Sequence, residues 1–175
     1  MKRQKFAAAA LLALLFSPAV AQRDPELDRL EIKMNKFLEN KMPGWKHKRG
    51  EPMQGSNNIL IEFWSTSDRV VKISIVPYAS AHDAKQVLSE FLKYESQKEE
   101  LKDYGDESYG WGYGASKVAL RRGRFLVYVN TYAEVASDPD AQSLSQSEKG
   151  ERERSEMRRL NKEFAKHVVS AIDQP

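Results

Sequence analysis

The stretch VALRRGRFLVYVNTY, residues 118–132, predicts a β-hairpin and with it the class of fold. In its second half Phe125, Val127 and Val129 alternate with other residues, so an extended chain would place them on one face. Gly123 lies between the two halves and can adopt the positive φ that a tight turn requires. The stretch therefore predicts two antiparallel strands joined by a short turn.

A second hairpin is predicted upstream, over residues 59–77. Apolar residues alternate along 59–64, and Val71, Ile73 and Ile75 share one face after a turn rich in Ser, Thr and Asp. Pro77 closes the second strand, because proline cannot donate a hydrogen bond to a neighbouring strand. The two hairpins supply the four clearest strands of the chain.

Three helices are predicted around these hairpins. The first begins with the cap Asp24 and with Pro25, and it ends at Pro43. The second spans residues 80–97, and the third is a charged amphipathic helix over residues 148–175. The apolar stripe of the third helix comprises Met157, Leu160, Phe164, Val168 and Ala171. This stripe suits either docking on the sheet or pairing with another helix.

Hairpins separated by a helix predict an α+β domain. We expect an antiparallel sheet of four or five strands, the fifth being a short edge strand over residues 45–49. The N-terminal, central and C-terminal helices should pack mainly on one face. Residues 22–135 form the core of the domain, and residues 136–147, rich in Ser, Asp and Pro, form a mobile linker. The helix over 148–175 belongs to the same domain.

The first 21 residues have the order of a secretory signal peptide. A basic start is followed by an apolar run over residues 6–16 and by an A-x-A cleavage site at 19–21. The run is shorter than the roughly 20 apolar residues that cross a membrane. We expect cleavage before Gln22, no stable membrane insertion afterwards, and a product that is periplasmic or extracellular. The absence of cysteine means that this product has no disulfide.

Cleavage changes the charge balance. The chain has 28 basic and 25 acidic residues, and three of the basic ones lie in the signal peptide, so the mature chain is neutral overall. Neutrality and export both argue against a nucleic-acid partner. We expect the partner to be an unknown protein or an envelope ligand, and the oligomeric state stays open.

The least ordinary segment is the Gly-aromatic loop, residues 105–114. Its second half alternates Tyr109, Trp111 and Tyr113 with glycines, so an extended chain would put three aromatic rings on one face. One interpretation is a binding platform, with Asp106 and Ser108 as hydrogen-bonding groups. The other is a strand whose aromatics fill the core beneath a helix. The two interpretations make opposite predictions about exposure.

Catalytic signatures are absent from the sequence. The three histidines, His47, His82 and His167, lack the close spacing of metal ligands, so neither a metal nor a cofactor is expected. Carboxylates near residues 106–107 leave an envelope-polymer hydrolase as an alternative. The C-terminal helix leaves a structural or assembly protein as another. The arginines around Gly123 are interpreted as a solvated hairpin tip rather than a contact for an anionic surface.

A resemblance adds to this interpretation. Residues 105–109, GDESY, followed by VALRRGRFLVYV at 118–129, resemble small exported bacterial domains of uncharacterised function. In those domains a helix, a Gly-Asp-Glu loop and an Arg-Gly hairpin follow one another. The resemblance covers about residues 59–129 and implies an α+β module in the bacterial envelope or outside the cell. The sequence therefore predicts an exported, non-catalytic domain that binds a ligand or protein near residues 105–114.

Overall fold

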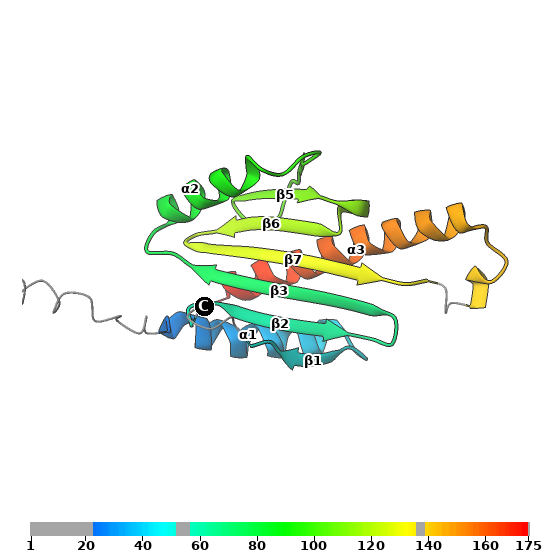
Figure 1. Ribbon diagram of the computed structural model, residues 1–175. Coiled ribbons are helices and arrows are strands. Elements are labelled where there is room, and N and C mark those ends of the chain that lie inside the picture. Colours follow the sequence, from blue (N-terminus) through cyan, green and yellow to red (C-terminus); the bar gives the residue numbers. More distant parts are fainter. Residues whose placement is uncertain (1–22, 52–56, 136–138, 175) are drawn as a thin grey trace, which may run out of the picture.

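The computed structural model describes residues 23–51, 57–135 and 139–174 (Figure 1). The predicted signal peptide lies outside the described residues. Within these ranges the chain forms one antiparallel sheet in the order β1-β2-β3-β7-β6-β5-β4. Its strands are β1 (Lys46–Arg49), β2 (Leu60–Ser65), β3 (Arg69–Pro77), β4 (Glu99–Glu100), β5 (Glu107–Trp111), β6 (Lys117–Arg122) and β7 (Phe125–Ala133). The α+β class is confirmed.

Both predicted hairpins form. In the first, β2 pairs with β3, and Leu60 lies opposite Ile75. In the second, β6 pairs with β7 around Gly123, whose φ of 56° is the left-handed conformation that the sequence predicted for this turn. The hairpins join through β3 and β7, with Ile73 opposite Val129. The longest strands therefore lie at the centre of the sheet.

The sheet has seven strands in the described residues, so the prediction of four or five is wrong. The two additional strands are β5, which pairs with β6, and β4, which pairs with β5. Strand β4 has two residues, Glu99 and Glu100, and carries no pattern that a sequence could reveal. Strand β5 contains Gly110, a residue that weakens strand propensity, and pairing with β6 outweighs this.

Helices cover both faces of the sheet (Figure 1). The helices are α1 (Pro25–Lys41), α2 (Ala81–Leu92) and α3 (Gln146–Asp173), with short 3-10 turns η1 (Tyr113–Ala115) and η2 (Pro139–Ala141). Asp24 caps α1 as predicted, through a hydrogen bond from the Glu26 amide. Helices α1 and α3 bury their apolar stripes in the main core, against one face of β2, β3, β6 and β7. Helix α2 packs on the opposite face.

Helix α2 covers only part of its face. Its buried residues Ala84, Leu88 and Leu92 form a second, smaller core with side chains from β5, β6 and β7. It is shorter than the predicted helix over 80–97, since it ends at Leu92. The rest of the same face, formed by β1, β2 and β3 with the adjoining ends of β6 and β7, has no described helix above it. In this uncovered half, the strand side chains are not covered by a described helix.

Candidate functional site

The Gly-aromatic loop contributes mainly to the small core. Trp111 is only 6% exposed, and its ring contacts Phe91 of α2 edge-on at 5.6 Å between centroids. Tyr109 is half-buried and packs against the same cluster. Trp111 and Tyr109 therefore follow the interpretation in which these aromatics fill a core beneath a helix.

Tyr113 leaves the aromatic row. The chain departs from β5 after Trp111, and Tyr113 begins η1, so the expectation of three rings on one face is wrong at this residue. Its side chain is 54% exposed, and the Arg154 guanidinium of α3 lies 5.0 Å above the ring. Arg154 also donates a 2.7 Å hydrogen bond to its hydroxyl. Gly114 allows this contact, because a Cβ there would lie 2.6 Å from the Arg154 Cα.

Ser108 and Asp106 are both engaged in contacts within the fold. The buried Ser108 hydroxyl donates to the Leu101 carbonyl at 2.8 Å. Asp106 accepts hydrogen bonds from Arg121, Arg122 and the Gly123 amide at 2.8 to 2.9 Å. Burial opposes ionisation of Asp106, but these bonds and the arginine charges outweigh it and lower its pKa. The five predicted binding residues thus do not gather on one surface.

A histidine and a buried carboxylate meet beneath β1, a contact that the sequence interpretation missed. The His47 ring bonds to the carboxylate of Glu62, which is completely buried in the main core. Burial raises the pKa of Glu62, and the hydrogen bond from His47 opposes this rise. Arg49, two residues along β1, pairs with Glu31 of α1 at 3.2 Å. These contacts anchor the edge strand from its core side.

Because side chains alternate along a strand, anchoring β1 presents its other residues on the opposite face. The sequence KHKR directs His47 and Arg49 inward and Lys46 and Lys48 outward. The sequence shows this segment only as an uninterrupted run of basic residues. What the sequence could not show was that Glu62 and Glu31 lie beneath two of them.

We call the uncovered half the open face. It comprises Lys46, Lys48, Ile61, Phe63, Val70, Lys72, Lys117, Asn130 and Tyr132. Strand register aligns five of these in one row across β1, β2, β3, β7 and β6, in the order Lys48, Phe63, Lys72, Asn130, Lys117. Neighbouring strands are about 4.8 Å apart, so this row is about 19 Å long. A parallel row contains Lys46, Ser65, Val70 and Tyr132.

The strand residues of the open face carry positive charge, and none of them is acidic. Every side chain that β1, β2, β3 and β7 direct to it is basic, apolar or uncharged, and the one acid of β2, Glu62, points the other way. Lys72 lies 5.9 Å from the Phe63 ring centroid, and no ion pair forms at Lys46, Lys48, Lys72 or Lys117 within the described residues. The surface also exposes large apolar groups, since Tyr132 is 59% and Val70 37% exposed.

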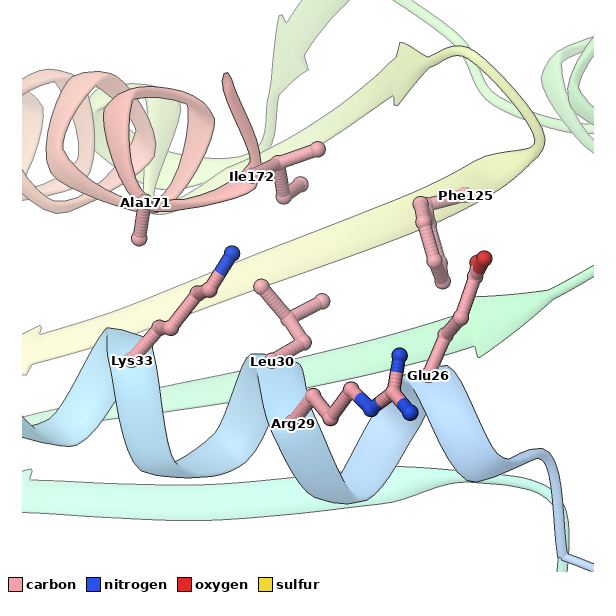
Figure 2. Close-up of a pocket in the computed structure, with 7 residues that line it drawn as sticks. All are labelled: Glu26, Arg29, Leu30, Lys33, Phe125, Ala171 and Ile172. Atoms are coloured by element: carbon pink, nitrogen blue, oxygen red, sulfur yellow. The ribbon is translucent and has the colours of Figure 1, made fainter. Parts of the chain in front are cut away.

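A pocket of about 260 Å³ lies on the other side of the molecule. Figure 2 shows its lining between α1 and the end of α3, which comprises Glu26, Arg29, Leu30, Lys33, Phe125, Ala171 and Ile172. Glu26 is paired with Arg124, and the Lys33 ammonium donates to the Gln174 carbonyl at 3.0 Å. The polar rim is thus largely engaged within the fold, and the pocket offers less free charge than the open face.

Comparison of the chain with protein families, with curated proteins and with solved structures finds no match in any of the three. Among the described residues, no group of three or more His, Asp or Glu side chains could hold a metal ion. None of the helices in the described part of the chain is both long enough and apolar enough to cross a membrane.

Proposed function

We propose that the chain is an exported, non-catalytic binding domain that holds an anionic partner on its open face. The observation that carries the proposal is the row of Lys48, Lys72 and Lys117, in which the strand register places no carboxylate among the described residues. Consecutive lysines of the row lie two strand spacings, about 10 Å, apart, and like charges at this distance repel one another. An anionic partner removes that cost. A mature chain with no net charge therefore concentrates positive charge on one surface.

Burial of Trp111 supports this surface over the Gly-aromatic loop. A contact residue must lose exposed area when its partner binds, and Trp111 has almost none to lose. Tyr113 keeps an exposed ring, but the Arg154 guanidinium already lies over that ring and donates a hydrogen bond to its hydroxyl. Phe63, Val70 and Tyr132 of the open face carry no comparable contact from a helix.

The anchoring of β1 supports the same placement. An edge strand of four basic residues would repel itself, and pairing His47 with Glu62 and Arg49 with Glu31 holds it in the sheet. Lys46 and Lys48 are thereby presented at fixed positions. Binding to a prearranged surface costs less conformational entropy than binding to a flexible segment.

No observation favours the two alternatives. A hydrolase needs a carboxyl group that stays protonated as a general acid, and the lowered pKa of Asp106 works against that role. Assembly through the C-terminal helix needs a free apolar stripe, whereas Leu160, Phe164 and Val168 are buried in the chain's own core.

The proposal is tested with fluorescent dextran sulfate as an anionic probe, by fluorescence anisotropy. We expect binding at about 0.1 M salt that weakens strongly toward about 1 M, because the Debye length falls from about 10 to about 3 Å. The double variant Lys48→Glu/Lys72→Glu should lower the affinity about tenfold or more.

The matched control is Lys36→Glu/Lys166→Glu, which makes the same charge change at exposed positions of α1 and α3. These helices lie on the other side of the sheet, so this variant should bind within about twofold of wild type. Equal losses in the two variants would show that only net charge matters, and the proposal would fail.

A further inference from the structure

We infer that the anionic partner of the open face is a lipid bilayer surface, an inference that rests on the proposed function. Two properties of the face point to this class: apolar side chains mixed with the lysines, and cationic groups without directional partners. A soluble polyanion would need the charge but not the apolar groups.

The apolar groups lie between the charges. Val70 and Tyr132 are opposite one another on β3 and β7, and Phe63 lies between Lys48 and Lys72 in the neighbouring row. Tyrosine has an apolar ring and a polar tip, and such side chains favour the boundary between water and hydrocarbon. The headgroup and acyl boundary of a bilayer buries such groups.

The charged groups of the open face do not require directional hydrogen bonds from their partner. Lysine ammonium groups act as point charges on flexible stems, while the planar guanidinium suits specific bidentate contacts. In the hairpin tip Arg121, Arg122 and Arg124 all make ion pairs within the fold. The free cations of the open face are lysines, which suit a two-dimensional field of phosphate groups.

The length of the row suits an extended partner. It is about 19 Å long and crosses five adjacent strands, and the flexible lysine stems can extend from a twisted sheet toward one surface. Long lysine stems can also extend their ammonium groups toward headgroups while Phe63 and Tyr132 contact the boundary beneath. The helices α1 and α3 lie behind the sheet and would stay in water.

The test is co-sedimentation of the protein, without its signal peptide, with vesicles. We expect binding to vesicles of equal parts phosphatidylcholine and phosphatidylglycerol, and no binding to pure phosphatidylcholine, because the anionic surface potential attracts the lysines. Lys48→Glu/Lys72→Glu should reduce the partition coefficient at least about tenfold. The control Lys36→Glu/Lys166→Glu should leave it within about twofold.

A second pair of variants separates a bilayer from a soluble polyanion. Tyr132→Ser should weaken vesicle binding about threefold or more while leaving the affinity for dextran sulfate unchanged, since only the bilayer buries the ring. Ile32→Ser, which changes a 71% exposed apolar residue of α1, should alter neither. Melting temperatures near the wild-type value confirm that both variants fold.

The outcomes distinguish the two proposals. Binding of dextran sulfate without binding of anionic vesicles overturns the lipid inference and leaves the anionic-partner function standing, with a soluble polymer or acidic protein as the partner. Vesicle binding that Tyr132→Ser does not weaken also overturns it. Binding of neither probe overturns both.

Discussion

Trp111 stabilises the protein through the small core between α2 and the sheet. Its ring packs on Phe91, and Leu126 and Leu88 belong to the same cluster. The indole N–H is buried and has no hydrogen-bond partner among the described residues, so part of the gain from burying the ring is offset. The residue therefore matters for its volume and apolar surface rather than for its polar group.

The residue-scale prediction compares two substitutions at this position. Trp111→Ala should lower the free energy of unfolding by about 3–5 kcal/mol, because it removes a large buried ring and leaves a cavity. Trp111→Phe should cost clearly less, since it retains most of the apolar volume and removes the unpaired N–H. Urea denaturation measures both. Trp111→Ala as stable as wild type would place the ring outside the core.

At the scale of elements, α3 is joined to the sheet by a buried polar contact as well as by its apolar stripe. Asn161 donates to the Ala115 carbonyl of η1 at 2.5 Å and accepts from the Thr131 hydroxyl of β7 at 2.5 Å. Ala115, Thr131 and Asn161 are all buried, and an unpaired buried polar group costs about 1–3 kcal/mol. The amide thus determines how α3 sits along β7.

The element-scale prediction uses this dependence. Asn161→Leu should cost about 2–4 kcal/mol of unfolding free energy, because it leaves both the Ala115 carbonyl and the Thr131 hydroxyl without partners. Adding Thr131→Val should restore about 1 kcal/mol, since it removes one of the two unpaired groups. Denaturant titration of the single and double variants measures the coupling. Strictly additive losses would contradict the contact.

At the scale of the whole molecule, the tip of the β6–β7 hairpin joins the start of α1 to the end of α3. Arg124 pairs with Asp24 at 2.7 Å and with Glu26 at 2.6 Å. On the other side Arg122 pairs with Asp173 at 2.6 Å. The basic tip, which the sequence interpretation left solvated, is thus an ion-pair network. These pairs join residues between 51 and 100 positions apart in the sequence, which only the fold brings together.

The ion pair between Arg124 and Asp24 makes the stability of the protein depend on pH. The hydrogen bond from Arg124 lowers the pKa of Asp24 below its ordinary value of 3.8, and burial only partly opposes this. A carboxyl whose folded pKa is lowered contributes stability that is present above its unfolded pKa and lost as the pH falls through the folded pKa. Arg124→Gln should therefore destabilise the protein by about 1–2 kcal/mol at neutral pH. That difference should shrink as the pH falls below 3.8, the ordinary pKa, and through the lowered folded pKa of Asp24.

Thermal unfolding of wild type and variant across this pH range measures the effect. Arg29→Gln is the matched control, because Arg29 makes no ion pair within the described residues and its loss should change little at any pH. If the stability difference between Arg124→Gln and wild type stays constant down to acid pH, Arg124 does not lower the pKa of Asp24.

The sequence was informative where side chains repeat with a short period. The alternation over residues 118–132 predicted β6 and β7, and the cap at Asp24 predicted the start of α1, because both depend on near neighbours. It was uninformative for β4, whose two residues join the sheet only because β5 is already there. It also missed the contact between His47 and Glu62, two residues on different strands.

By itself, the sequence determined the hairpins, the helices and the α+β class, since local alternation and capping are enough to select each element. Only the tertiary structure decided which face of each strand is covered. Alternation divides a strand into two faces without saying which one meets a helix, and the position of α2 settles this. Helix α2 buries Trp111 and leaves Lys48, Lys72 and Tyr132 on the part of the face that it does not cover. One helix of twelve residues covers only part of a sheet of seven strands.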